Sequence, residues 1–352
     1  MVGKYTLKRK ALALTAVSAT LLLTAVSAVQ PADAAAKKKL NLGMIYYQSN
    51  VQAFQAMADG GNAAANVYGN VKLVSAAPSN EDAAKELQLF QSAANVSKDG
   101  VVLQTLAGST FLRAVQAVTK RGIPVITIDA PLPDGSGSNL FITNDNKTVG
   151  ADLAKAVLAK VPADKTGEVV ITTNGAAVPP LQARVAGMIE TIKALRPDLT
   201  IVGPLTTGNS TANLASIQSV LNAHPDAVAY LSPDDQDAAS IAVVSKNTGK
   251  KYNAGGCDLE AAALQGVKDG YITAMGSPEH YIKGYLAMQI LIDHATKGTA
   301  IPAGVWNTAD LVVTPANVDA VIAREKTAAA RTAYFKSKVA TELKSLYSAL
   351  NK

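Results

Sequence analysis

The sequence predicts an α/β fold of two lobes, each built around a doubly wound parallel sheet. Strand and helix patterns alternate along the chain in two successive series. Residues 122–129 (GIPVITID) form a nearly continuous apolar run, typical of a strand buried on both faces of a parallel sheet. With 352 residues, 48% hydrophobic and 17% charged, the chain is long enough for two lobes with separate cores.

The first series of elements runs from about residue 40 to residue 160. Short apolar runs predict its strands at 40–47, 70–75, 99–103, 123–129 and 139–143. Residues with helical spacing lie between and after them, at 53–67, 80–94, 109–121 and 147–160. Acidic residues open the second helix, as the helix dipole favours, and Ser109 is predicted to cap the third.

The second series extends from about residue 167 to residue 297. Its strands are predicted at 167–173, 199–202, 227–231, 252–257 and 272–275. The helices between and after them are predicted at 181–195, 210–223, 237–246, 259–268 and 281–297, the last long and apolar. Right-handed crossovers are expected throughout, because a right-twisted strand feeding a helix packs back on the sheet that way.

The tail, residues 318–352, has a helical pattern with an apolar stripe. The stripe consists of Tyr334, Phe335, Val339, Leu343, Leu346 and Leu350. We expect this helix to pack along the protein's own surface, and a helix that binds a partner is the alternative.

The N-terminus predicts a cleavable signal peptide over residues 1–36. An uncharged segment at 11–29 follows a basic segment made of Lys4, Lys8, Arg9 and Lys10. Residues 32–34 (ADA) then give a small-residue cleavage pattern. An uncleaved membrane anchor is the alternative, since 19 uncharged residues are just long enough to span a bilayer. No cysteine lies near the cleavage pattern, so we expect no lipid anchor.

The charge and cysteine content argue against a nucleic-acid partner and against an internal disulfide. Residues 1–36 hold four of the 33 basic and one of the 27 acidic residues, so the rest of the chain has a net charge of only +3. This balance gives no reason to expect a nucleic-acid partner. Cys257 is the single cysteine, so there is no internal disulfide, and a small buried apolar role is preferred to a reactive thiol.

Motifs of catalysis and metal binding are absent from the sequence. The three histidines, His224, His280 and His294, have no metal-ligand spacing. No phosphate-binding loop, dinucleotide fingerprint or nucleophile elbow occurs. We therefore expect no cofactor, no metal and no enzymatic activity.

Polar residues follow several predicted strands, where open α/β sheets bind ligands. They include Gln104 after the third strand, Asp129 after the fourth, and Asp234 and Asp258 in the second series. Carboxylates accept hydrogen bonds from hydroxyl groups, amides both accept and donate, and Arg184 offers a forked donor. Such a set suits a neutral, hydroxyl-rich ligand. Capping of the next helix is the alternative for Asp235, Asp237 and Asp258.

From about residue 40 to residue 320 the chain resembles the type I periplasmic binding proteins, especially the ribose- and galactose-binding branch that serves ABC transporters. The resemblance rests on the order and spacing of several short stretches. They are residues 122–129 (GIPVITID), 143–146 (TNDN) with Gly150, 183–184 (AR) with 187–188 (GM), 224–228 (HPDAV), 276–278 (GSP) and 312–318 (VVTPANV).

This resemblance implies two lobes that close on a ligand by hinge bending, joined by three crossings near residues 142–143, 276–277 and 305–307. The expected division has four parts. They are a signal peptide at 1–36, an N-terminal lobe at 37–142 plus 277–305, a C-terminal lobe at 143–276 plus 306–320, and a C-terminal helical extension at 321–352.

The resemblance also implies ligand contacts, at Asn50, Phe54, Asp129, Arg184, Asp234 and Asp258. The sequence departs from the ribose-type pattern at Ala53, at Ala130, where an arginine is expected, and at Gly276, where a glutamine is expected. Replacement contacts are expected from Gln104 and Trp306, with hinge packing as the alternative for Trp306; Tyr46, Tyr47 and Glu279 are further candidates.

The implied function is an exported, monomeric solute-binding protein that captures a sugar or sugar-like polyol and delivers it to an ABC transporter permease from the periplasm. One alternative is the presentation of a signalling ligand, such as a furanosyl quorum signal or a chemotaxis ligand, to a receptor. Another is an exported enzyme in which Asp234, Asp235 and Asp258 supply a carboxylate pair. The sequence further predicts that Asp129→Ala keeps the fold and loses ligand-induced stabilisation.

Overall fold

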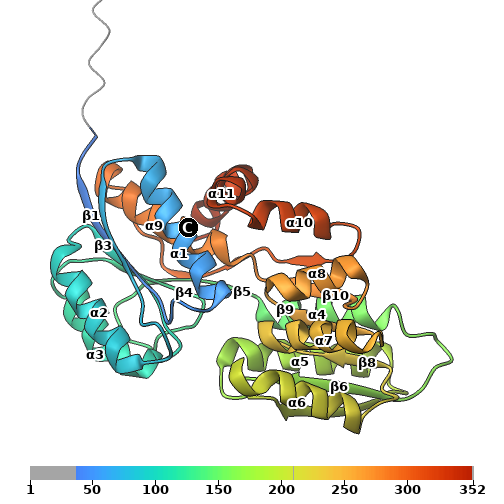
Figure 1. The fold of residues 1–352 in the computed structure, drawn as a ribbon. Coiled ribbons are helices and arrows are strands. Elements are labelled where there is room, and N and C mark those ends of the chain that lie inside the picture. The colour runs from blue at the N-terminus through green and yellow to red at the C-terminus, as the bar shows by residue number, and fades with distance from the viewer. Residues whose placement is uncertain (1–36, 209, 351–352) are drawn as a thin grey trace, which may run out of the picture. The chain divides into compact units, whose positions relative to one another are not determined.

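The computed structural model describes residues 37–208 and 210–350. The predicted signal peptide at 1–36 lies outside these residues. The part of the chain that is described contains two six-stranded sheets with helices on their faces, which confirms the predicted α/β fold of two lobes (Figure 1).

The first sheet has the strand order β11-β5-β4-β3-β1-β2, and all its pairings are parallel. Its strands are β1 (Leu40–Ile45), β2 (Val71–Ala76), β3 (Gly100–Gln104), β4 (Val125–Ile128), β5 (Leu140–Asn144) and β11 (Gly304–Thr308). The helices that pack on it are α1 (Gln52–Tyr68), α2 (Ala83–Val96), α3 (Gly108–Thr119), α9 (His280–Lys297) and α11 (Ala328–Leu350).

The second sheet has the order β12-β10-β9-β8-β6-β7, parallel except for β12, which pairs antiparallel with β10. Its strands are β6 (Glu168–Thr173), β7 (Thr200–Thr206), β8 (Ala229–Leu231), β9 (Ala254–Cys257), β10 (Ala274–Ser277) and β12 (Leu311–Val313). Its helices are α4 (Asn146–Leu158), α5 (Pro179–Leu195), α6 (Ser210–Ala223), α7 (Asp235–Thr248), α8 (Ala261–Asp269) and α10 (Val318–Glu325).

Both faces of the first sheet are buried, which explains the apolar run that ends at Asp129. Ile126 and Ile128 of β4 face the core shared with α1 and α9, whereas Val125 faces the core shared with α2 and α3. A strand whose successive side chains enter two different cores favours apolar residues at most positions, and the one polar side chain of β4, Thr127, is hydrogen-bonded to Ser138 Oγ at 2.9 Å. All four residues of β4 are buried, as the sequence predicts.

Two glycines let α1 and α9 approach one another closely. A Cβ atom on Gly60 would lie 2.0 Å from the Tyr281 carbonyl oxygen, and one on Gly284 would lie 1.8 Å from that of Met57. No side chain fits at these distances, so glycine is required at both positions. The close contact fixes α9, whose first turn carries residues of the candidate site.

Two local predictions need correction. Ser109 does not cap α3, which begins at Gly108 without a side-chain cap, whereas Asp82 caps α2 by accepting from the Lys85 N–H at 2.8 Å. The expected lobe boundary after residue 305 falls inside β11. Trp306 pairs with Ile142 along β5, and the rest of the strand follows in register, so residues 306–308 belong to the first sheet.

The C-terminal extension consists of two helices that join different cores. Val318 and Val321 of α10 are buried in the core of the second sheet. Phe335, Val339 and Leu346 of α11 are buried in the core of the first sheet. The apolar stripe predicted for the tail therefore packs on the protein itself, which confirms the preferred reading of that stripe.

Candidate functional site

The candidate site forms where strands of both sheets end. Asp129 directly follows β4 of the first sheet, and Asp258 directly follows β9 of the second. These two residues and Glu279 are the non-glycine residues with positive φ among the described part of the chain, at +75°, +65° and +50°. Aspartate enters this region more readily than most residues, yet the conformation still stores strain. Such strain gathers where a side chain must be aimed at a ligand.

Asp129 forms a buried ion pair with Lys283 of α9. The Lys283 ammonium lies 2.7 Å from Asp129 Oδ1, and its side chain is fully buried. Gln104 Nε2 donates to the other carboxylate oxygen at 3.5 Å. Burial alone would raise the pKa of Asp129, but the charge and hydrogen bond of Lys283, together with the charges of His280 and Arg184, hold that pKa below its ordinary value. Asp129 is therefore ionised and acts as an acceptor.

Asp258 is held by Arg184 of α5. The Arg184 Nη1 lies 3.1 Å from Asp258 Oδ2 and also donates to the Pro233 carbonyl at 2.8 Å, while its Nε donates to Asn146 Oδ1 at 3.0 Å. Burial would raise the pKa of Asp258, but the charge of Arg184 holds it well below its usual range. The fork of Arg184 thus fixes an ionised carboxylate in the second lobe.

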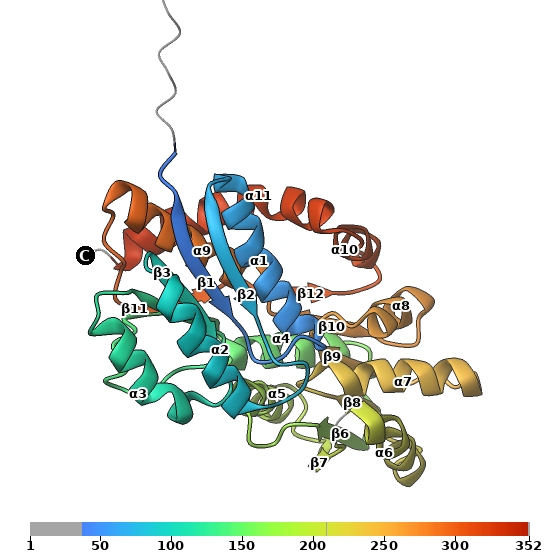
Figure 2. The same cartoon turned by 60° about the vertical axis from the view of Figure 1, so that its left-hand side comes forward.

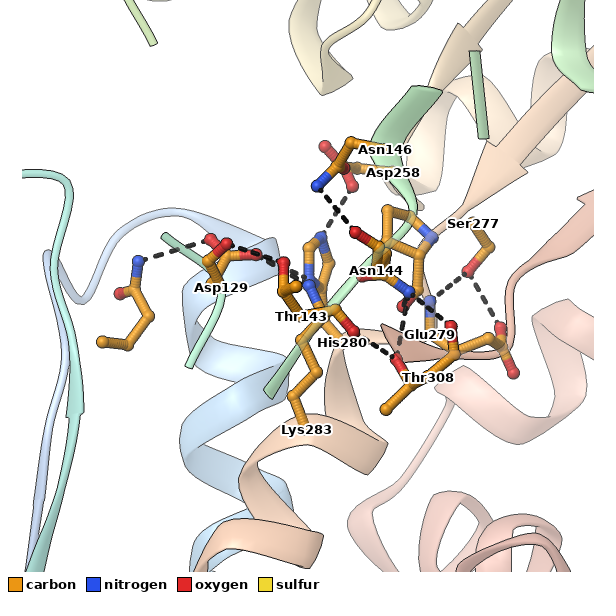
Figure 3. A network of polar contacts seen from close by, with 12 residues as sticks. Asp129, Thr143, Asn144, Asn146, Asp258, Ser277, Glu279, His280, Lys283 and Thr308 are labelled. Carbon is orange, nitrogen blue, oxygen red and sulfur yellow. Dashed lines mark hydrogen bonds and ion pairs between the residues drawn. The ribbon is translucent and has the colours of Figure 1, made fainter. Parts of the chain in front are cut away.

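His280 lies between the two carboxylates, in the first turn of α9 (Figure 3). Its Nε2 is 2.7 Å from Asp258 Oδ1, and its Nδ1 is 3.9 Å from Asp129 Oδ1. Burial, together with the charge of Lys283, lowers the pKa of His280, so the ring is neutral at physiological pH. Because Asp258 can only accept, Nε2 carries the proton and Nδ1 is an acceptor.

The free Nδ1 of His280 is the feature of this arrangement that points to a ligand. It is buried and has no hydrogen-bond partner within the described residues. Its neighbour, Asp129 Oδ1, is also an acceptor, so the two atoms cannot bond to one another. Buried acceptors are normally satisfied. A group that donates to both, such as two neighbouring hydroxyls, would complete this position.

Asn144 ties the lobe crossings together beside the site. Its amide nitrogen lies 2.8 Å from the Pro278 carbonyl oxygen and 3.0 Å from Thr308 Oγ1 (Figure 3). Thr308 Oγ1 in turn donates to the Thr143 carbonyl at 3.1 Å, and Thr143 Oγ1 donates to the Asp129 carbonyl at 2.9 Å. The ends of β5, β10 and β11 are thereby linked to the backbone of Asp129.

Four of the eight residues expected at the site come together, namely Gln104, Asp129, Arg184 and Asp258. The other four have different surroundings. Asn50 is exposed and accepts from Gln48. Phe54 packs edge-to-face on Tyr47 at 5.5 Å, against the first core.

The side chains of Asp234 and Trp306 bond to residues outside the His280 network. Asp234 caps α7 by accepting from the Asp237 N–H, and its second oxygen accepts from the Asn174 N–H. Trp306 packs against the first core, and its Nε1 donates to Glu342 at 2.9 Å, which corresponds to the hinge-packing alternative. Both carboxylate oxygens of Asp234 thus accept backbone N–H groups, which corresponds to the capping role.

His280 and Lys283 are site residues that the sequence reasoning missed. The sequence suggests only a metal-ligand role to test for His280, and Lys283 lies inside a helix that the sequence predicts to be apolar. One signal was present, because Lys283 is in helical register with Ala287 and Ile290 on the buried face of α9. A lysine on a buried helical face needs a negatively charged partner. Only the tertiary structure identifies that partner.

Another buried carboxyl, Glu86 of α2, lies near the first-lobe end of the site. Its Oε2 accepts from Thr105 Oγ1 at 3.1 Å, and its Oε1 has no partner among the described residues. Thr105 directly follows Gln104 at the end of β3. Burial raises the pKa of Glu86 from 4.5 to about 8, so the side chain is protonated at neutral pH.

Glu86→Gln is expected to stabilise the protein increasingly as pH rises from about 4.5 to 8. In this window the unfolded chain releases the Glu86 proton while the folded chain retains it, so the wild type loses stability on the order of 5 kcal/mol. Glutamine has no proton to lose. Urea unfolding at several pH values measures the difference, with the exposed Glu190→Gln as control. A pH-independent difference would contradict the raised pKa.

Membrane-spanning helices and metal clusters are both missing from the described residues. No helix there is long and apolar enough to cross a membrane. No group of three or more His, Cys, Asp or Glu side chains is placed to hold a metal ion in that part of the chain.

Relatives of known function resemble this chain along most of its length. The D-allose-binding periplasmic protein of Escherichia coli (strain K12) is 26% identical over 235 residues, covering 64% of this chain and 75% of that protein. The ribose import binding protein RbsB of Bacillus subtilis (strain 168) is 23% identical over 291 residues, covering 81% of this chain and 93% of that protein.

Solved structures share the two-lobe fold. An ABC transporter solute binding protein from Agrobacterium vitis with bound D-fucose superimposes with a TM-score of 0.69 at 26% identity, covering 79% of this chain and 96% of that chain. The glucose-galactose binding protein GanP of Geobacillus stearothermophilus gives a TM-score of 0.68 at 22% identity, covering 80% and 99%. Residues 42–299 match the family described as the periplasmic binding protein domain. Since this match spans well over half of the chain, the protein belongs to the periplasmic binding protein family.

Proposed function

We propose that this protein is a non-catalytic, extracytoplasmic binding protein that captures a neutral sugar or polyol between its lobes and delivers it to an ABC transporter permease. The observation that carries the proposal is the meeting of ionised acceptors from both lobes, Asp129 and Asp258, around the buried free Nδ1 of His280. Relatives named for allose, ribose and xylose or arabinose binding support the ligand class.

Charge balance supports a neutral ligand rather than an acidic one. Lys283 compensates Asp129, and Arg184 compensates Asp258, so neither cation is left to pair with a carboxylate or phosphate of the ligand. Bringing an extra negative charge into such a site costs free energy, because desolvation is not repaid by a partner. A sugar hydroxyl, in contrast, can donate to the acceptors that are present.

Binding would act by a population shift. A ligand that bonds to Asp129 in the first lobe and Asp258 in the second stabilises arrangements in which these residues lie close together. A permease that recognises that arrangement then receives only loaded protein. Binding alone requires one protein copy, so we propose a monomer that carries no cofactor.

Thermal unfolding against a panel of neutral sugars, polyols, uronic acids and sugar phosphates tests the proposal. At about a hundredfold excess over Kd, a true ligand stabilises the folded state by about 2.7 kcal/mol, which raises Tm by several degrees. We expect a neutral sugar or polyol to do so. Stabilisation by acidic sugars alone, or by no compound, would refute the proposed ligand class.

Site variants locate the effect. Asp258→Asn is expected to remove the ligand-induced rise in Tm, because it weakens both the acceptor and its pairing with Arg184. Asp134→Asn, an exposed change in the loop after β4, should keep the full rise. Equal responses of the two variants would place the ligand elsewhere.

A further inference from the structure

The C-terminal helices form a fourth connection between the lobes. The chain crosses three times between its two sheets, after β5, after β10 and after β11. It then enters the second core with α10 and returns to the first core with α11 (Figures 1 and 2). The turn between the two helices consists only of residues 326–327. We call residues 318–350 the C-terminal strap; it lies beyond the stretch matched by the family, which ends at residue 299.

A buried ion pair anchors the strap to the hinge. Arg324, at the end of α10, donates through Nη1 to Glu279 Oε2 at 2.9 Å and through Nη2 to Glu279 Oε1 at 2.6 Å. Both side chains are only 2% exposed. A two-pronged contact of this kind fixes direction as well as distance. Lys338 of α11 adds a second positive charge 3.5 Å from Glu279 Oε2.

Glu279 belongs to the second crossing and immediately precedes His280. Its backbone has a φ of +50°, an unfavourable conformation for a glutamate, and its side chain also accepts from Ser277 Oγ at 2.8 Å (Figure 3). A strained conformation persists only when its surroundings hold it. The ion pair with Arg324 holds Glu279 in this conformation. The next residue along the chain is His280, so the conformation of Glu279 also sets the position of the site histidine.

Aromatic residues of the strap make further contacts next to His280. The Phe335 ring stacks on Tyr281 at 4.9 Å between ring centroids. Arg324 also lies over the ring of Tyr334 at 4.6 Å. Tyr281 follows His280 directly, so residues 279 and 281 are both fixed by the strap while residue 280 points to the site.

We propose that Arg324 is a positioning residue: the C-terminal strap holds Glu279, and through it His280, in the orientation that ligand capture needs, and it restrains the opening of the two lobes. The inference rests on the proposed function for its effect on ligand affinity, but its effect on lobe opening does not depend on any ligand. Ligand affinity is thus controlled by a residue that does not touch the ligand.

Arg324→Lys is the first test, because it keeps the charge and the apolar stem but loses the fork. The second variant, Glu279→Gln with Arg324→Gln, removes both charges and leaves neither one buried alone. A matched control is Lys268→Gln with Asp319→Asn, which removes the exposed ion pair, 2.7 Å long, between α8 and the same helix α10. Chemical denaturation establishes that each variant is folded.

Two readouts separate positioning from simple loss of stability. Spin labels at Lys120→Cys in the first lobe and Lys193→Cys in the second, both exposed, report the distribution of lobe separations without ligand. Calorimetric titration with the neutral sugar or polyol that stabilises the wild type most reports Kd. We expect the neutral double variant to bind at least about tenfold more weakly, with Arg324→Lys in between, and both to show a broader and longer distance distribution. The control pair should match the wild type in both measurements.

Unchanged Kd together with unchanged distances in either folded variant would overturn the proposal. If the wild type binds no compound of the panel, the proposed function fails on its own, and the distance distributions still decide the inference about the strap. A changed distribution then supports the strap, and an unchanged one refutes it.

Discussion

Lys283→Met is expected to lower the free energy of unfolding by about 3–5 kcal/mol, because it leaves the carboxylate of Asp129 buried without its counter-charge. The lysine side chain is fully buried, and its ammonium lies 2.7 Å from Asp129 Oδ1. Guanidinium chloride unfolding at pH 7 measures the loss. It should shrink as the pH falls towards 4, since the orphaned Asp129 can then take up a proton.

Two further variants make the origin of this loss clear. Lys283→Met combined with Asp129→Asn should recover much of the stability, because no charge is left unpaired, and asparagine tolerates the positive φ of residue 129. Lys297→Met is the control on the same helix. Its ammonium is paired with Asp293 but is itself exposed, so the change should cost no more than about 1 kcal/mol. A similar loss for Lys283→Met and Lys297→Met would show that the buried pair is not formed.

Arg184→Met is expected to cause the second large loss, about 3–5 kcal/mol of stability, and to abolish ligand-induced stabilisation. The guanidinium is 2% exposed and bonds to Asn146, to the Pro233 carbonyl and to Asp258. Removing it leaves Asp258 with His280 alone. The pKa of Asp258 should therefore rise towards its ordinary value, and an ionised acceptor is no longer fixed in the second lobe.

Denaturation and the sugar panel measure the two parts of this effect. Arg113→Met, an exposed change on α3, should behave as the wild type in both. Arg184→Met with Asp258→Asn should regain stability, since the orphaned charge is gone, but should not regain the response to ligand. Recovery of the ligand response in that double variant would mean that neither residue holds the ligand.

These ion pairs change how Asp129 can be tested. From the sequence, Asp129→Ala is a variant that keeps its fold and loses ligand-induced stabilisation. The structure adds that alanine would leave Lys283 charged and fully buried without a partner, and would place a residue less suited than aspartate at a φ of +75°. A stability loss is therefore expected alongside any loss of binding. Asp258→Asn likewise leaves the buried Arg184 without its counter-charge, so denaturation of each variant must accompany the binding measurement.

The sequence by itself determined the elements and the edge at which the site lies. The apolar run before Asp129 predicted a strand buried on both faces, and β4 has all four residues buried. Polar residues after strands predicted where Gln104, Asp129 and Asp258 would gather. These features are local, because the side-chain period of a strand or helix and the residues at its end are written within a few positions of the chain.

Only the tertiary structure decided which charges meet and what the tail does. Lys283 pairs with Asp129, which is 154 residues away in the sequence, and Arg324 pairs with Glu279, which is 45 residues away. The periodicity of α9 and α10 predicts which helix face is buried, but it does not predict which charged residue that face contacts. That choice depends on how helices and sheets pack, which brings distant segments within a few ångströms. The buried ion pairs, the free Nδ1 of His280 and the fourth connection between the lobes all arise at this level.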